Sequence, residues 1–243
     1  MWSAEVTGRF AREALAAGEG EVCAVFRRSF YLRCAGERYA CVGDTALGHG
    51  PLNVLVPGFS MPALGDRIAV STQDASVWQP PPHEGTIDLG LLGEKAKTRI
   101  PAEGLGGLVI GAHNALSGHA QPALDALERW LVGNALADEA QQLIGLGPGL
   151  TPSGDDYLGG MLVALRLTGR SMQAEGLWRW LQPRLKARTS AISAAHLAAA
   201  AAGEAHEALH RVLGGDADLE KLDGVGHCSG WDALAGAVAV LKG

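Results

Sequence analysis

The chain has 243 residues, of which 47% are hydrophobic and 19% are charged, a length sufficient for one large domain or two small ones. The formal net charge of −6 argues against a nucleic-acid partner, and without a Lys/Arg cluster we expect no membrane-surface role. The N-terminus lacks the apolar core of a signal peptide, and no apolar window is long enough to span a bilayer. We therefore expect a cytoplasmic protein whose four cysteines are reduced thiols.

The N-terminal third is predicted to be rich in β-strands. After an opening helix over about residues 4–17, short β-branched and aromatic runs separated by glycine turns predict strands near 22–27, 29–34, 38–42, 52–56, 67–70 and 76–78. Three consecutive prolines at 80–82 cannot join a sheet ladder or a helix interior. We therefore expect an N-terminal β-rich module, mostly antiparallel, over residues 1–82.

Residues 83–243 are predicted to form a larger, all-helical module. Leu124, Leu127 and Leu131 recur at helical spacing, and Pro122 suits the first turn of that helix. Further helices are predicted over 157–168, 174–187, 190–202, 204–213 and 231–242. The fold class expected from this order is α+β.

Two segments of the helical part resemble each other. Residues 153–165 and 229–241 align without a gap and share the residue types of Ser153/Ser229, Gly154/Gly230, Asp156/Asp232, Leu158/Leu234, Gly160/Gly236 and Leu165/Leu241. A glycine in a helix interior costs about 1 kcal/mol relative to alanine. Close contact between the two helix backbones at Gly160 and Gly236 would offset that cost.

The residue types that the two segments share also fit helix initiation. Ser153 and Ser229 are expected as N-caps, with Asp156 and Asp232 reaching back to the cap amides; Thr151 followed by Pro152 is an alternative start for the first helix. If the two N-termini lie together, their dipoles and unpaired N–H groups would attract an anion. The alternative is two well-capped helices without a ligand.

Asp155 is not explained by helix initiation, because its counterpart in the second segment is Trp231. It lies about 100° around the helix from Asp156, so the two carboxylates do not form an acid/base dyad. A carboxylate beside an anion needs a positive or N–H-rich group between them. Either Mg²⁺ or a substrate amide or ureido group could serve, and Asp155 is therefore the candidate catalytic residue.

Three motifs follow one another in the helical part: "GLGPGLTPSGDD" (145–156), "RTSAIS" (188–193) and "GHCSGWDALAG" (226–236). In this order they resemble a bacterial family, the AllH-like family, that includes the AllH subunit of oxamate carbamoyltransferase, and Cys228 stands where the family pattern has Ser or Thr. "GHGPLNV" (48–54) is a weaker resemblance in the β-rich part. Motif matches and local pattern together give these candidate ligand-binding residues: Gly147, Gly149, Thr151, Ser153, Gly154, Asp156, Thr189, Ser190, Ser193, His227, Ser229 and His49.

The resemblance implies a carbamoyltransferase subunit that works with two other polypeptides in purine-nitrogen catabolism. The implied reaction is phosphorolysis of oxalurate to oxamate and carbamoyl phosphate, or its reverse. Carbamoyl phosphate combines a phosphate, suited to paired helix N-termini, with N–H donors suited to Asp155. No cofactor is certain, Mg²⁺ is a candidate, and a homo-oligomer is a further expectation. The alternative is a non-catalytic scaffold or regulatory subunit of the same kind of complex.

A rival motif occurs at 206–210, "HEALH", which fits the H-E-x-x-H pattern of zinc hydrolases. His206 and His210 would bind the metal and Glu207 would act as the base. A third protein ligand at a recognisable spacing is lacking, so we expect a solvated helix face here and no assigned metal ligand.

Overall fold

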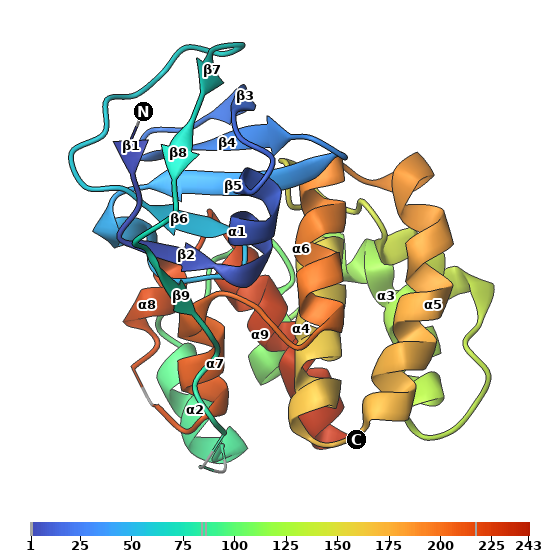
Figure 1. The fold of residues 1–243 in the computed structure, drawn as a ribbon. Coiled ribbons are helices and arrows are strands. Elements are labelled where there is room, and N and C mark those ends of the chain that lie inside the picture. Colours follow the sequence, from blue (N-terminus) through green and yellow to red (C-terminus); the bar gives the residue numbers. More distant parts are fainter. Residues whose placement is uncertain (1, 84, 86, 217) are drawn as a thin grey trace. The chain divides into compact units, whose positions relative to one another are not determined.

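The computed structural model describes residues 2–83, 85, 87–216 and 218–243. The chain divides into two compact units, Met1–Pro81 and Pro82–Gly243. The first contains a mostly antiparallel sheet and the second is helical, so the predicted α+β class is confirmed (Figure 1). No helix within the described ranges is long and apolar enough to cross a membrane.

A seven-stranded sheet forms the first unit, in the order β7-β3-β4-β5-β6-β2-β9, and a short parallel pair, β1-β8, accompanies it. The central strands pair antiparallel, whereas β5–β6 and β2–β9 are parallel. The six predicted strand regions are all found. The strands are β1 Trp2–Ser3, β2 Val6–Gly8, β3 Gly20–Val25, β4 Ser29–Cys34, β5 Arg38–Gly43, β6 Asn53–Leu55, β7 Arg67–Ile68, β8 Val70–Ser71 and β9 Ser76–Trp78.

The predicted opening helix over 4–17 is wrong at its start. Residues 2–8 form β1 and β2, and α1 spans only Arg9–Leu15. Val6 is paired with Leu55 on one side and with Ser76 on the other, so strand pairing from distant segments overrides the local helical pattern. Gly8 allows the backbone at Gly50 to approach the start of α1 closely, because a Cβ atom at residue 8 would lie 2.1 Å from the Gly50 carbonyl oxygen.

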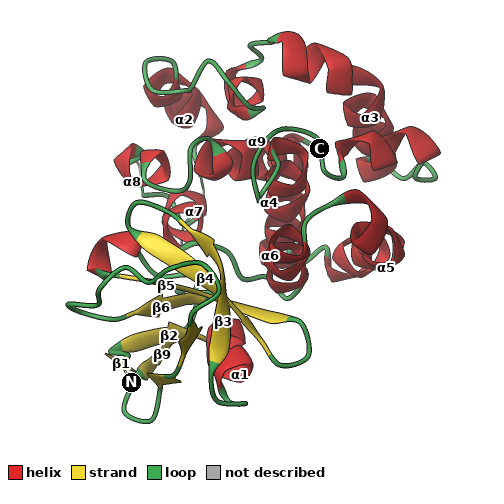
Figure 2. Cartoon of the chain, turned by 90° about the horizontal axis from the view of Figure 1, so that it is seen from above, coloured by secondary structure: helices red, strands yellow, loops and turns green. Residues whose placement is uncertain are grey.

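The second unit consists of helices joined by glycine-rich loops, and Figure 2 labels its helices α2 to α9 in red. The helices predicted for residues 157–242 are present, with ends shifted by a few residues. The helices are α2 Leu89–Ala96, α3 Ala115–Leu131, α4 Ser153–Leu167, α5 Ser171–Arg188, α6 Ala191–Ala201, α7 Glu207–Leu213, α8 Glu220–Asp223 and α9 Ser229–Lys242, with 3-10 turns η1 Thr45–Leu47 in the first unit and η2 Gly106–Ile110 and η3 Asp138–Leu143 in the second.

Helix α3 begins earlier than its sequence predicts. Asn114 is the N-cap: its side chain accepts a hydrogen bond from the Ser117 N–H, and the Ser117 hydroxyl accepts one from the Asn114 N–H. Pro122 therefore lies inside the helix and not in its first turn. Because proline has no N–H, the carbonyl of Gly118, four positions earlier, receives no helical hydrogen bond from residue 122.

Helix α4 is apolar on nearly every side and packs against α5, α6 and α9. Leu158, Met161, Leu162 and Leu165 are fully buried. A helix that is hydrophobic all round belongs in a core. This burial fixes α4 in the middle of its neighbours and so determines where its N-terminus emerges.

Candidate functional site

The two similar helices cross at the predicted glycines. A Cβ atom at Gly160 would lie 1.8 Å from the Ala233 carbonyl oxygen, and one at Gly236 would lie 1.8 Å from the Tyr157 carbonyl oxygen. Tyr157 and Ala233 occupy equivalent positions in the two segments, so the contact is reciprocal. The crossing brings the N-termini of α4 and α9 together, with 3.1 Å between the hydroxyl oxygens of Thr151 and Ser229.

The loops before the two helices also repeat each other. The Gly154 N–H donates to the Leu146 carbonyl at 2.9 Å, and the Gly230 N–H donates to the Val225 carbonyl at 3.2 Å. Gly147 and Gly226, the next residue in each loop, both have positive φ values of 111° and 59°. The similarity between the two helices therefore extends into the loops, although five residues separate Gly147 from α4 and only two separate Gly226 from α9.

The predicted capping boxes are wrong. Pro152 and Cys228 are the N-caps of α4 and α9, neither cap has a side-chain hydrogen bond, and Ser153 and Ser229 are the first helical residues. Asp156 and Asp232 are therefore the fourth residues of their helices, one position beyond the third residue that closes a capping box. They face the interface between the helices, where burial and helix contact determine their environment.

Asp156 and Asp232 form a pair of carboxyl groups at this interface. Asp232 is 1% exposed, and its Oδ1 accepts a hydrogen bond from the Leu105 N–H at 2.6 Å. Burial raises the pKa of Asp232 to about 6, against hydrogen bonds from Ser153, Leu105 and Gly106. Burial also raises the pKa of Asp156 well above its usual range; the Ser229 hydroxyl opposes this rise and the charge of Asp232 adds to it.

One oxygen of each of these carboxyl groups has no hydrogen-bond partner within the described part of the chain. The two atoms, Asp156 Oδ2 and Asp232 Oδ2, are also shielded from solvent. A buried carboxylate oxygen without a donor is costly, so a proton or a cation is needed there. These two carboxyl oxygens are thus the atoms of the site that can still accept a proton or bind a cation.

Asp155 has a different environment. Its carboxylate is 1% exposed and accepts hydrogen bonds from the Gly145 N–H at 2.8 Å, from the Ser193 hydroxyl at 2.6 Å and from the Thr189 hydroxyl. Burial raises the pKa of Asp155, and these three donors limit the rise. The side chain therefore ties the start of α4 to the start of α6 and to the glycine-rich loop. Its predicted catalytic role stays a prediction.

The glycine-rich loop presents backbone donors. The N–H groups of Gly149, Leu150 and Thr151 have no acceptor among the residues that the structure describes. The Ser190 hydroxyl donates to the Leu150 carbonyl at 2.5 Å. Because C=O and N–H point in opposite directions across a trans peptide, this bond directs the Thr151 N–H away from Ser190. The segment 189–193 thus positions the loop, whereas the predicted ligand-binding role of Thr189, Ser190 and Ser193 stays a prediction.

Two further groups of predicted residues have different local surroundings. His49 belongs to the unit Met1–Pro81, where its ring stacks on Trp78 with centroids 6.4 Å apart. The solvated helix face expected at 206–210 is wrong for its last residue, since His210 is buried and accepts a hydrogen bond from the Ala205 N–H at 3.1 Å. His206 is the N-cap of α7, which begins at Glu207, and its side chain accepts a hydrogen bond from the Ala208 N–H.

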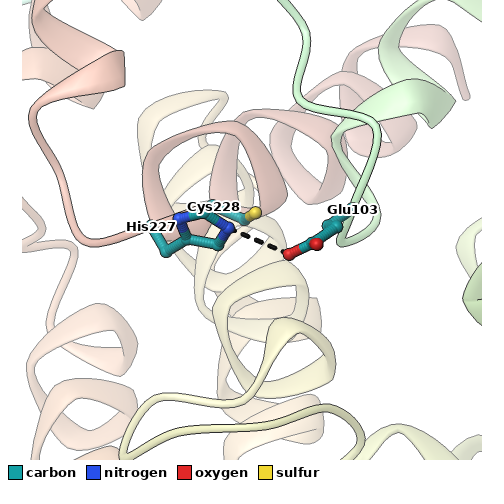
Figure 3. Close-up of side chains that lie close together, drawn as sticks. All are labelled: Glu103, His227 and Cys228. Carbon is teal, nitrogen blue, oxygen red and sulfur yellow. Dashed lines mark hydrogen bonds and ion pairs between the residues drawn. The ribbon is translucent and has the colours of Figure 1, made fainter.

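The loop before α9 holds a side-chain cluster that sequence reasoning missed. Figure 3 shows Glu103, His227 and Cys228 together, with a 2.9 Å contact between His227 Nε2 and Glu103 Oε2. Burial raises the pKa of the Cys228 thiol to about 11, and the neighbouring carboxyl groups add to the rise. Glu103 lies 124 residues from His227 and follows no recognisable spacing, so no signal in the sequence joins them.

Residues 143–241 match the family model of the oxamate carbamoyltransferase subunit AllH. The resemblance indicated by the sequence motifs is therefore confirmed over this segment. It runs from the glycine-rich loop through α9 and contains every predicted site residue except His49; Glu103 and Asn114 also lie outside it. No solved structure matches the chain significantly.

Proposed function

We propose that this chain is a subunit of a carbamoyltransferase of the oxamate type and that it binds carbamoyl phosphate or a related anion at the 147–151 loop. The observation that carries the proposal is the run of three N–H groups, at Gly149, Leu150 and Thr151, without an acceptor in the described structure. Successive N–H groups of this kind form anion-binding concavities. The match of residues 143–241 to the AllH model supports the reaction class.

The helix N-termini are part of the same proposal. The N–H groups of Gly154 and Gly230 donate to loop carbonyls, so we expect the loop and the Thr151 and Ser229 hydroxyls to make contacts to the anion while the dipoles of α4 and α9 add positive potential. Asp155 then acts as a positioning residue that holds the loop and does not touch the ligand.

A Mg²⁺ requirement is part of the proposal. The ion favours oxygen ligands, and it fits Asp156 and Asp232, whose Oδ2 atoms lack donors, better than Asp155, which accepts three hydrogen bonds. Bound there, it would supply positive charge beside a phosphate. As in the multi-subunit enzyme that the family name describes, the partners would be other polypeptides of the complex.

Calorimetric titration tests the proposal, with carbamoyl phosphate, inorganic phosphate and oxamate as ligands, each with and without Mg²⁺. Thr151→Val and Ser229→Ala should each weaken carbamoyl phosphate binding by about tenfold, the effect of losing one hydrogen bond of about 1.4 kcal/mol. Ser171→Ala, which removes an exposed hydroxyl at the start of α5, is the matched control and should bind like the wild type.

The outcomes separate the two candidate roles. Asp156→Asn together with Asp232→Asn should abolish any Mg²⁺ effect while binding without Mg²⁺ persists. If the unmodified chain binds none of the three ligands, the ligand-binding proposal is overturned and a scaffold or regulatory subunit is the better account.

A further inference from the structure

We propose that Glu103, His227 and Cys228 form a binding site for a zinc-type transition-metal ion. One ligand atom from each side chain, namely a carboxylate oxygen, an imidazole nitrogen and the thiol sulfur, lies within 4.8 Å of the other two. Figure 3 shows the three side chains gathered where the loop before η2 meets the start of α9. The proposal does not depend on carbamoyl phosphate binding.

The donor set determines the class of ion. A thiolate and an imidazole favour zinc, cobalt or copper, whereas Mg²⁺ and Ca²⁺ take oxygen ligands. Zinc sites with three protein ligands leave a fourth position for water or substrate. In a tetrahedral site with ordinary bond lengths, ligand atoms lie about 3.5 Å apart, so a shift on the order of 1 Å would complete the geometry. Glu103 and His227 are exposed and can make that shift by rotation of their side chains.

The backbones that carry these ligands are held from both sides. Asp232 in the first turn of α9 accepts the Leu105 N–H, and the Asn114 side-chain amide donates to the Ala102 and Gly104 carbonyls at 3.0 and 2.8 Å. Gly104 has a positive φ of 76°, and a Cβ atom there would lie 3.0 Å from the Cys228 Cβ. The two loops therefore approach closely because residue 104 is a glycine.

Local charge also favours a cation. The Glu103 carboxylate and a Cys228 thiolate together balance the two charges of Zn²⁺. A metal ion would thus neutralise a cluster of acidic groups that otherwise repel one another.

Cobalt(II) titration of the chelator-treated full chain tests this site, because a thiolate bound to cobalt gives a charge-transfer absorption that oxygen and nitrogen ligands do not. The wild type should take up one equivalent of cobalt with this absorption, and zinc should displace it. Cys228→Ser should abolish the absorption. Glu103→Gln and His227→Asn, at exposed positions that leave the fold intact, should weaken cobalt binding by about tenfold or more.

The matched control is Cys23→Ser, which removes a partly buried thiol of the other unit and should leave cobalt binding unchanged. Absence of the absorption in the wild type overturns the proposal. So does an absorption that persists in Cys228→Ser or cobalt affinity unaffected by both Glu103→Gln and His227→Asn.

Discussion

Gly160 on α4 and Gly236 on α9 each face a carbonyl oxygen of the other helix, and a Cβ atom at either position would lie 1.8 Å from it. The contact is between backbones, so no side-chain rotation can relieve an added methyl group. This reciprocal contact sets the distance between the helix N-termini and hence the arrangement of Thr151, Ser229, Asp156 and Asp232.

Gly160→Ala and Gly236→Ala should therefore each lower the free energy of unfolding by about 2 kcal/mol or more, because overpacking outweighs the helix propensity gained. Urea unfolding followed by circular dichroism measures the change. Gly176→Ala on α5 is the control: nothing lies within 4 Å of its Cβ position, so the variant should be more stable by up to about 1 kcal/mol. Equal effects at the three positions would contradict a specific crossing.

The helix crossing could be predicted from the sequence because mid-helix glycines at matching positions leave few explanations. The strand regions followed from short β-branched runs between turns. The start of the chain could not be predicted, since Val6 pairs with Leu55 and Ser76, far away in the sequence. Local propensity favoured a helix there, and strand pairing outweighed it.

The site was predicted in part for similar reasons. The motifs correctly grouped the loop at 147–151 with Thr189, Ser190 and Ser193, which contact it or Asp155. The prediction of capping boxes is wrong because the spacing between serine and aspartate is the same whether the serine is the N-cap or the first helical residue. Glu103 was missed because tertiary contact alone brings it to His227.

Asp155 should prove important for stability. Asp155→Ala leaves the Gly145 N–H and two hydroxyl groups without their acceptor in a buried place, which should cost about 3 kcal/mol of unfolding free energy. Asp155→Asn keeps one acceptor and should lose roughly half as much. Denaturant unfolding of both variants gives the values.

A double-mutant cycle isolates the hydrogen bond that the Ser193 hydroxyl donates to the Asp155 carboxylate. Asp155→Ala combined with Ser193→Ala should destabilise by about 1 kcal/mol less than the sum of the single changes. Asp138→Ala removes an exposed carboxylate of η3 and serves as the control, with a change within about 0.5 kcal/mol. Strict additivity of the Asp155 and Ser193 changes would show that they do not interact.

Buried neutral histidines should lower stability in mild acid, against the opposite contribution of Asp156 and Asp232, whose raised pKa values favour the folded chain as the pH falls. Burial lowers the pKa of His210 to about 4, and the nearby His83 and His206 imidazoles lower it further. The folded-state pKa is thus below the unfolded value of about 6.5, so the unfolded chain binds the proton first. The contribution of His210 is fully present above pH 6.5 and is lost as the pH falls from 6.5 towards 4, by up to about 3 kcal/mol.

Urea unfolding at pH 7.5 and pH 5 tests this linkage. His210→Gln should raise the stability at pH 5 relative to that at pH 7.5, because glutamine does not titrate and its side-chain oxygen can accept the Ala205 N–H. Burial likewise lowers the pKa of His196 to about 4, so some pH dependence should remain in this variant. The exposed His119, changed to Gln, should leave the difference as in the wild type. An unaltered difference in His210→Gln would refute its role.

Asn114 has two separable functions that different substitutions can resolve. Its side-chain oxygen caps α3, and its side-chain amide holds the loop that carries Glu103. Asn114→Asp keeps the oxygen that caps α3 but removes both hydrogen bonds donated to the Ala102 and Gly104 carbonyls, whereas Asn114→Ala removes the cap and both donated bonds. We expect Asn114→Ala to lower the free energy of unfolding by about 1 kcal/mol more than Asn114→Asp, the usual worth of an N-cap.

Cobalt binding reports on the second function of Asn114, which is to hold the loop that carries Glu103. Both Asn114 variants should weaken cobalt binding to a similar degree, because both release the Ala102 and Gly104 carbonyls and so loosen the position of Glu103. Ser117→Ala disturbs the capping box without touching that loop, and it should lower stability while metal affinity stays as in the wild type. If Asn114→Asp binds cobalt as tightly as the wild type, the loop does not need this anchor, and the position of Glu103 depends on the Asp232–Leu105 hydrogen bond alone.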